Sequence, residues 1–511
     1  MFAQIYGSTT LGINGILITV EVDISNGLPS FDIVGLADAS VRESRERVRA
    51  AIKNSGFEFP TRKITVNLAP ADIKKISSGL DLPIAIGILV ASGQLREEDL
   101  ADYVFAAELS LEGRLRQITG ILPMSIACKE NQITKMIVAP ENAQEALWAG
   151  SIEVYAMSDL KQVVEHLRRE NIADPVIKDK KILNENFVLE DFKDVQGQIV
   201  AKRALEIAAA GRHNVLMTGP PGSGKTMLAR RMPSILPEMF EEEALEVTKI
   251  YSIAGLLRPN EGLIGQRPFR NPHHTISDAG MIGGGRIPRP GEVTLSHNGV
   301  LFLDELPEFP RIVLESLRQP LEDGQVTVSR VNASFCFPSR FMLIAAMNPC
   351  LCGRQNDGTN TCTCTPVEIK KYNKKISGPL LDRIDLNIFV PRLEYKEIAN
   401  ASQEESSSDI KKRVEAARKI QQDRLHKWGI LCNGQMTHKH IKELCNLTSD
   451  AQNLLEMAFN KMNLSARAYD RIIKVAQTIA DLENSKDIGT AHIAEAIQFR
   501  NDIKSSSIRT T

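Results

Sequence analysis

The chain of 511 residues is 43% hydrophobic and 24% charged, a composition typical of globular proteins with several domains. A formal net charge of −1 excludes a protein that coats nucleic acid by overall attraction, so contact with a polyanion would require a local basic patch. The most apolar internal run, LDLPIAIGILVA, is too short to span a bilayer and contains Asp81 and Pro83. Because no basic segment precedes an apolar core at the amino terminus, we expect a cytoplasmic protein without a membrane segment.

The first predicted domain covers residues 1–165. It mixes the strand patterns ILITVEV, KITVNLA and IEVYAM with the helical patterns ASVRESRERVRAAIKNSG and DLPIAIGILVASGQL, which indicates a compact α/β unit. Residues 166–190 are charged and weakly patterned, and this composition predicts a linker.

The second predicted domain covers residues 191–392, and a third region covers residues 393–511. Strand and helix patterns alternate in the second domain, which predicts a parallel sheet with crossover helices. Charged amphipathic helices follow, most clearly SSDIKKRVEAARKIQQDRLHKW and SARAYDRIIKVAQTIADLEN. The fold class is therefore multidomain α/β with a helical carboxyl-terminal region.

The strongest motif is HNVLMTGPPGSGKTMLARRM, an apolar strand followed by a glycine-rich turn and a helix. This is the context that a P-loop requires. Backbone N–H groups of such a turn contact phosphates, Lys225 adds charge at the β and γ phosphates, and the Thr226 hydroxyl ligates Mg²⁺. We therefore expect ATP and Mg²⁺ as cofactors. The predicted nucleotide-binding residues are Gly219, Pro220, Pro221, Gly222, Ser223, Gly224, Lys225 and Thr226.

Two further strand patterns end in polar residues that suit ATP hydrolysis. In GVLFLDEL an apolar strand precedes Asp304, which is predicted to hold the Mg²⁺ shell, and Glu305, which is predicted to polarise the attacking water. In FMLIAAMNP the strand ends at Asn348, whose amide is predicted to position that water. For Asn348 the alternative is a simple Asn-Pro turn.

Four of the eight cysteines gather in CLCGRQNDGTNTCTC: Cys350, Cys352, Cys362 and Cys364. Structural disulfides are rare in a reducing cytoplasm, so such a cluster indicates metal ligands or transient redox chemistry. Four thiolates satisfy tetrahedral Zn²⁺. The leading hypothesis is structural zinc, and the alternatives are unliganded reduced thiols or a redox switch.

Several long motifs resemble those of the ComM/YifB branch of the magnesium-chelatase-related AAA+ ATPases: FKDVQGQ, RPFRNPHHTIS, GEVTLSHNGVLFLDELPEF, AAMNPCLCG, SGPLLDRIDL and LSARAYDRI. The resemblance extends over essentially the whole chain. It implies a Lon-protease-like amino-terminal domain, an AAA+ P-loop core and a carboxyl-terminal helical lid. It also implies a homohexameric ring with ATP at the subunit boundaries.

The same resemblance implies roles for two arginines. Arg383 in LLDRID matches the arginine finger that reaches the γ-phosphate of a neighbouring subunit, and Arg467 in LSARAYD matches the sensor-2 arginine of the lid. The residues alone leave an ordinary ion pair open for each arginine, with Asp382 or Asp385 as the partner of Arg383.

Two insertions in the P-loop domain are candidates for DNA contact. Residues 267–290 contain four arginines and one acidic residue, and residues 325–340 have the pattern of a β-hairpin. In the wider clade of this family such insertions point into the central channel, where positive charge follows a phosphate backbone without reading bases. The candidates are Arg286, Arg289 and Arg330, with ordinary solvated arginines as the alternative.

The front domain resembles the Lon-protease fold but departs from it at the catalytic positions. Asp81 stands where the peptidase has its serine, and Leu122 lies about where its lysine would be. Without a hydroxyl nucleophile and an amine base, proteolysis has no mechanism. We therefore expect a non-proteolytic domain.

The resemblance implies an ATP-driven DNA translocase or helicase that promotes branch migration during homologous recombination in natural transformation. The implied partners are branched or single-stranded DNA, further copies of the chain and recombinase-pathway proteins. The alternative is a chelatase-like AAA+ remodeler that acts on a protein partner.

Overall fold

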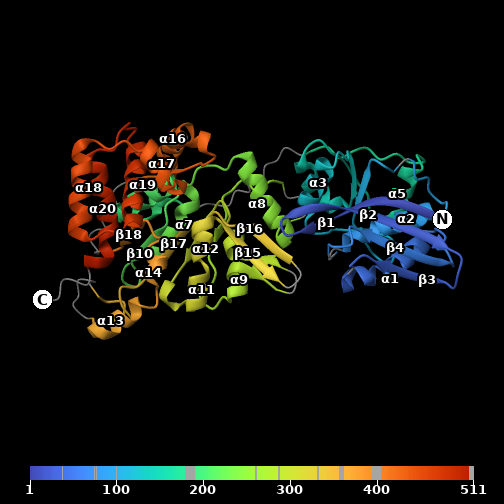
Figure 1. The fold of residues 1–511 in the computed structure, drawn as a ribbon, viewed down its shortest axis with the longest axis horizontal. Helices are drawn as coiled ribbons and strands as arrows, with labels where there is room; N and C mark the ends of the chain where they lie inside the picture. Colours follow the sequence, from blue (N-terminus) through green and yellow to red (C-terminus); the bar gives the residue numbers. More distant parts are fainter. Residues whose placement is uncertain are drawn as a thin grey trace. The chain divides into compact units, whose positions relative to one another are not determined.

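The computed structural model describes residues 1–36, 38–73, 75, 78–98, 100–178, 190–258, 262–285, 288–330, 333–355, 362–393 and 404–505. These residues divide into two compact units (Figure 1). The first unit gathers Met1–Asn184, Phe240–Gly265 and Ser329–Cys336, and the second contains the rest of the chain.

A seven-stranded mixed sheet, in the order β3-β4-β2-β1-β5-β8-β9, forms the centre of the first unit. β2 is antiparallel to β1 and β4, and the other neighbouring strands are parallel. Buried and less buried residues alternate along β4, as expected for a strand with one face on the core. The strands are β1 (Phe2–Leu11), β2 (Asn14–Ser25), β3 (Ser30–Val34), β4 (Lys63–Ala69), β5 (Tyr103–Ala106), β8 (Lys135–Val138) and β9 (Glu153–Ala156), with a small ladder of β6 (Glu108–Leu109) and β7 (Leu115–Arg116).

Helices of the first unit pack against this sheet and against one another. α2 is buried along its whole length, which explains why its sequence is apolar all round. α8 follows the P-loop helix in the chain, yet it packs against α3 of the first unit, where Ser252 Oγ donates a 2.5 Å hydrogen bond to Glu145. The helices are α1 (Ala39–Asn54), α2 (Asp81–Ala91), α3 (Ile121–Glu130), α4 (Ala143–Ala146), α5 (Leu160–Leu167) and α8 (Glu241–Ala254).

Asp81, at the first position of α2, is fully buried and ion-paired. Its carboxylate accepts hydrogen bonds from Arg47 Nε at 2.7 Å, from Arg47 Nη2 at 3.0 Å and from the backbone N–H of Leu109 at 3.2 Å. Burial raises the pKa of Asp81, while the hydrogen bonds from Arg47 oppose that rise. The Asp81 carboxylate therefore joins α2 to Arg47 of α1.

The second unit is built on a five-stranded parallel sheet in the order β11-β14-β17-β10-β18. β14 and β17 are buried at every position, as is typical of the central strands of a parallel sheet. This confirms the parallel sheet predicted for the second domain. The strands are β10 (Val215–Thr218), β11 (Phe269–Arg270), β14 (Val300–Leu303), β17 (Met342–Met347) and β18 (Leu386–Phe389).

Helices surround this sheet, and the carboxyl-terminal region is helical as predicted (Figure 1). α16 and α19 pack against α6, and α20 packs against β18. Asp385, just before β18, accepts a hydrogen bond from the backbone of Asn214 and lies 3.6 Å from Arg471 of α19. The helices are α6 (Ile199–Gly211), α7 (Lys225–Ile235), α9 (Asp278–Ile282), α10 (Glu292–Leu295), α11 (Arg311–Ser316), α12 (Arg318–Asp323), α13 (Pro366–Asn373), α14 (Gly378–Leu381), α16 (Ser407–Leu425), α17 (His438–Leu444), α18 (Ser449–Met462), α19 (Ala466–Leu482) and α20 (Thr490–Ser505).

Each insertion contains a pair of short strands. In the first, β12 (Gly283–Gly284) pairs antiparallel with β13 (Arg289–Pro290), which the sequence did not predict. In the second, β15 (Gln325–Arg330) pairs with β16 (Ala333–Pro338), as the strand pattern of residues 325–340 predicts. Within the described ranges, no helix has both the length and the apolar character needed to cross a membrane.

Replacement of Arg47 tests the buried ion pair of the first unit. Arg47→Ala leaves the Asp81 carboxylate without its charged partner, so we expect the local stability of α2 to fall by roughly 2–4 kcal/mol. Hydrogen exchange of the α2 amides in the full chain measures this change. Arg45→Ala removes an exposed arginine from the same helix, so it should change the stability by less than about 0.5 kcal/mol. Equal protection of α2 in the two variants would contradict a stabilising role for the pair.

Candidate nucleotide site

The P-loop connects β10 to α7, as the sequence predicts. Glycine is required at its three glycine positions for two different reasons, a positive φ angle and the close approach of a neighbouring backbone. Gly222 and Gly224 have φ values of 75° and 91°, a region in which a side chain is strained. At Gly219 a Cβ atom would lie 2.2 Å from the carbonyl oxygen of Val390, so only glycine fits beside the end of β18. These glycines allow the turn to curl over the amino terminus of α7, where anions bind favourably.

Lys225 is buried at the first position of α7. Its Nζ donates hydrogen bonds to the carbonyl oxygens of Gly219 at 2.7 Å and Pro220 at 2.9 Å. The same atom lies 3.4 Å from Oδ1 of Asn348. Burial lowers the pKa of Lys225, and the nearby charge of Asp304 opposes this effect. An ammonium held by neutral oxygen atoms in a buried turn suits an anionic ligand.

The predicted Mg²⁺ residues lie together. Thr226 Oγ1 donates a 2.7 Å hydrogen bond to Asp304 Oδ2, and the backbone N–H of Glu305 donates to Asp304 Oδ1 at 3.0 Å. Parallel pairing places the ends of β10, β14 and β17 at the same edge of the sheet, which is why residues distant in sequence meet there. A hydroxyl and a carboxylate at this spacing are ligands that Mg²⁺ accepts together with phosphate oxygens.

Glu305 has a neighbour that no sequence motif indicates. Its backbone is left-handed, with φ 53°, and its side chain is 59% exposed. His274 Nδ1 lies 3.6 Å from Glu305 Oε2, and the His274 ring lies against those of His273 and Phe309. The paired histidines in RPFRNPHHTIS were the only sequence signal for this contact.

Asn348 is also held by residues that the sequence did not single out. Tyr372 of α13 is buried, and its phenol oxygen accepts a hydrogen bond from the backbone N–H of Asn348. Burial raises the pKa of Tyr372 to about 12. Gly353, with φ 75°, lies so close to Pro221 that a Cβ atom would be 2.6 Å from its Cδ. The cysteine-rich loop therefore contacts the P-loop through Gly353, and α13, which follows the loop, contacts Asn348 through Tyr372.

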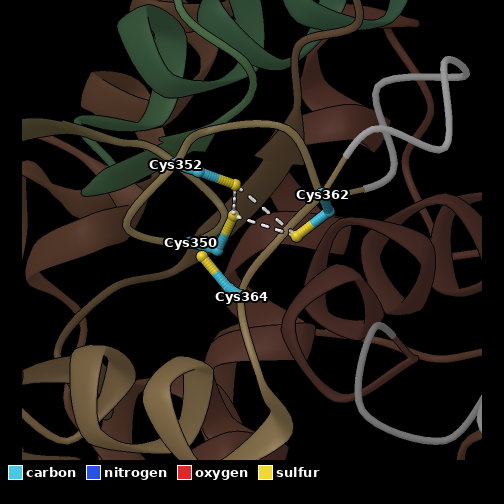
Figure 2. A group of neighbouring side chains, drawn as sticks. All are labelled: Cys350, Cys352, Cys362 and Cys364. Atoms are coloured by element: carbon cyan, nitrogen blue, oxygen red, sulfur yellow. Dashed lines mark hydrogen bonds between the residues drawn. The ribbon is translucent and has the colours of Figure 1, made fainter.

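Figure 2 shows the four cysteine sulfur atoms directed toward a common centre. The Sγ atoms of Cys350 and Cys352 are 3.4 Å apart, and the Sγ atom of Cys362 lies 3.7 Å and 3.6 Å from them. All four sulfur atoms, with Cys364 included, lie within 4.8 Å of one another. Hydrogen bonds from the backbone N–H groups of Arg354 and Thr363 lower the pKa of Cys352.

This cluster fits tetrahedral zinc. Zinc–sulfur bonds of about 2.3 Å place the sulfur atoms at the corners of a tetrahedron about 3.8 Å apart, which is close to the observed separations. Backbone N–H groups directed at sulfur are also typical of thiolate sites. The four cysteines would hold a structural ion, because they supply all the ligands that tetrahedral zinc takes.

The two predicted nucleotide-contacting arginines both lie near Glu322 of α12. Arg383 is buried, contacts Glu322 through Nη2 and donates to the carbonyl oxygens of Arg318 and Pro379. Arg467 is 63% exposed, and its Nη2 lies 3.9 Å from Glu322. Arg383 therefore forms an ion pair, but the expected partners were wrong: among the described residues its carboxylate partner is Glu322, not Asp382 or Asp385. Asp385 lies near Arg471 of α19. Beside Arg383 lies a cavity of about 490 Å³ that Glu322 also lines.

The structure separates the arginines of the first insertion into two kinds. Arg267 donates to the carbonyl oxygens of Pro237, Glu238 and Asn298, and Arg270 makes a two-bond contact with Glu292. These two arginines stabilise the fold. Arg289 is exposed on β13, opposite Gly284 of β12. Arg286 lies outside the described residues, and for Arg330 only the backbone, at the end of β15, is described.

Three family models match successive parts of the chain. Residues 191–398 match magnesium chelatase, subunit ChlI; residues 20–142 match subunit ChlI of Mg-chelatase; and residues 404–500 match the ChlI C-terminal model. Together they account for most of both structural units.

Curated relatives match over the full length. The chain is 44% identical over 502 residues to competence protein ComM of Haemophilus influenzae. The aligned region covers 98% of this chain and 97% of that protein. It is 43% identical over 501 residues to protein YifB of Salmonella typhimurium, again with 98% and 97% covered. Lon protease 2 of Bacillus subtilis matches a shorter part, with 35% identity over 156 residues, 28% of this chain and 27% of that protein. The chain belongs to the ComM/YifB family of magnesium-chelatase-related proteins.

Proposed function

We propose that the protein is an ATPase that works as a hexameric ring and moves along DNA, promoting branch migration during the recombination of incoming DNA. The observation that carries the proposal is the meeting of Lys225, Thr226, Asp304 and Asn348 at one sheet edge. The family relationship adds support, because one full-length relative is named a competence protein.

Each residue at the sheet edge has a role in this proposal. Lys225 and the P-loop backbone bind the phosphates of ATP, and Thr226 and Asp304 hold Mg²⁺, which neutralises developing phosphate charge. Glu305 polarises the attacking water, and Asn348 orients it. His274, whose Nδ1 lies 3.6 Å from Glu305 Oε2, is proposed to orient that carboxylate.

The domain division follows the same proposal. Residues 1–165 form a non-proteolytic Lon-like domain, residues 166–190 a linker, residues 191–392 the AAA+ core and residues 393–511 a helical lid. The Asp81 carboxylate forms an ion pair with Arg47 and is not a nucleophile in this proposal. The front domain then has a structural or docking role.

Ring assembly brings Arg383 to the γ-phosphate of the neighbouring subunit and Arg467 to the nucleotide from the lid. In the single chain Glu322 contacts Arg383 and lies near Arg467, so assembly would have to exchange this carboxylate for phosphate. Both ligands are anionic and suit a guanidinium. Arginine engagement would thereby couple hydrolysis to subunit contact.

DNA contact is assigned to the two insertions, through Arg286, Arg289 and Arg330. Of these, Arg289 is exposed in the structure. Arginines on loop or turn segments can follow phosphates in any sequence. A protein partner in place of DNA is the alternative, because the family models carry the name of a chelatase subunit.

We also infer that Cys350, Cys352, Cys362 and Cys364 hold a structural zinc ion. The sulfur separations support this assignment. The unliganded and redox alternatives predict protein without stoichiometric metal.

Substitution of Glu305 separates binding from hydrolysis. Glu305→Gln keeps the P-loop intact but weakens water activation, so we expect nucleotide affinity within about twofold of the parent and turnover lower by about 10²–10⁴-fold. Equilibrium binding and phosphate release measure the two effects. Glu308→Gln, an equal charge change in the following turn, should retain turnover. An unchanged hydrolysis rate in Glu305→Gln would reject the role of Glu305.

Strand exchange on a synthetic three-strand junction tests the DNA proposal. We expect ATP-dependent branch migration, ATP turnover that rises with DNA, and DNA affinity that falls by about 10³–10⁵-fold between 50 and 200 mM salt if six to ten phosphates are contacted. Lys225→Ala should abolish migration because it removes the phosphate-binding charge. Turnover that ignores DNA but rises with a protein partner would favour the remodeler.

Metal analysis tests the zinc assignment. Protein purified without chelator should contain about one zinc per chain, and Cys362→Ser should lose it. Cys336→Ser, at an exposed cysteine outside the cluster, should keep the metal. Less than about half a zinc per parent chain would contradict the assignment.

A further inference from the structure

We propose that metal held by the four-cysteine cluster controls the nucleotide site, by fixing Asn348 and the P-loop through Gly353 and Tyr372. This proposal goes beyond a purely structural zinc and rests on the nucleotide-binding function proposed above. Its chemical basis is a tetrathiolate site for a zinc-like divalent cation that is linked to the phosphate-binding turn.

The cluster joins two segments that flank Asn348. Cys350 and Cys352 directly follow β17 and Asn348, while Cys362 and Cys364 directly precede α13. A metal bound by all four sulfur atoms would hold the exit of the sheet strand against the start of the helix (Figure 2). The described residues between β17 and α13 contain no strand or helix. Bonds from a metal to the four sulfur atoms would therefore fix these described residues, in which no hydrogen-bonded ladder does so.

The first contact from this loop reaches the P-loop. The turn Cys350–Gly353 is closed by a 3.0 Å hydrogen bond from Gly353 N–H to the Cys350 carbonyl oxygen. Gly353 is buried, and its backbone lies against the ring of Pro221, so closely that a side chain would collide. The position of the cysteine turn therefore limits the position of Pro221, in the middle of the phosphate-binding turn.

The second contact connects α13 to Asn348. Tyr372 lies eight positions after Cys364, and its buried phenol oxygen accepts from the Asn348 backbone N–H. The Asn348 amide oxygen lies 3.4 Å from Lys225 Nζ. A shift of α13 would therefore move Asn348 relative to the ammonium that is to bind phosphate. Small displacements of such groups weaken both binding and catalysis.

Metal removal from the full chain gives the first test. Zinc is extracted with a chelator, and its release is measured together with amide hydrogen exchange and the affinity for a fluorescent ATP analogue. We expect faster exchange both at residues 350–355 and in the P-loop, with nucleotide affinity lower by about tenfold. Restoring zinc should reverse both changes. Exchange that rises only in the cysteine loop, with the P-loop unchanged, would overturn the coupling.

Two variants that leave every cysteine in place test the contacts themselves. Gly353→Ala places a methyl group against Pro221, and Tyr372→Phe removes the acceptor of the Asn348 N–H. Both variants should keep zinc. Gly353→Ala should weaken nucleotide affinity by about tenfold. Tyr372→Phe should lower kcat by about tenfold. Gly429→Ala is the matched control, because Gly429 has φ 66° and no atom lies within 4 Å of the point that an added Cβ would occupy. It should bear the same backbone strain without changing nucleotide affinity.

The outcomes separate this proposal from the broader function. Zinc-replete variants with parental affinity and kcat would overturn the coupling while leaving the ATPase proposal intact. Parent protein that binds no nucleotide would refute the ATPase proposal, and hydrogen exchange of the P-loop would still decide whether the metal controls this turn.

Discussion

The hydrogen bonds of the buried Lys225 ammonium group are the interaction on which the rest of the proposed nucleotide site depends. Its hydrogen bonds to the Gly219 and Pro220 carbonyl oxygens hold the positive charge in the bend between β10 and α7. Burial disfavours that charge, so a phosphate at this position gains from an interaction that water does not weaken. Glycines at 222 and 224 allow the bend, and the close approach of Val390 excludes a side chain at 219.

The parallel sheet determines which other groups can join this charge. Three adjacent strands end at the same edge, so Thr226, Asp304 and Asn348 approach Lys225 although they are distant in sequence. Side chains outside the sheet contact these groups: His274 lies beside Glu305, and the phenol of Tyr372 accepts a hydrogen bond from the backbone of Asn348. The cysteine cluster belongs to this supporting layer, because its turn packs on Pro221.

The positions of site residues that directly follow a strand were predictable from the sequence, because each of them belongs to a short local motif. The P-loop, the parallel sheet and the carboxyl-terminal helices follow from spacing and periodicity alone. The partners of Arg383 and Glu305 were not predictable, since Glu322 and His274 meet them only through tertiary packing. Likewise, no pattern in EEEALEVTKIYSIA indicates that α8 packs with the first unit, where Ser252 contacts the buried Glu145.

The most direct test of the account is a structure of the full chain with a non-hydrolysable ATP analogue and Mg²⁺. The account predicts that Lys225 Nζ exchanges its contacts with the Gly219 and Pro220 carbonyl oxygens for phosphate oxygens, with the terminal phosphate between Lys225 and Asn348 and the ion at Thr226. Nucleotide bound elsewhere, or a Lys225 ammonium that keeps its carbonyl contacts beside bound nucleotide, would contradict it.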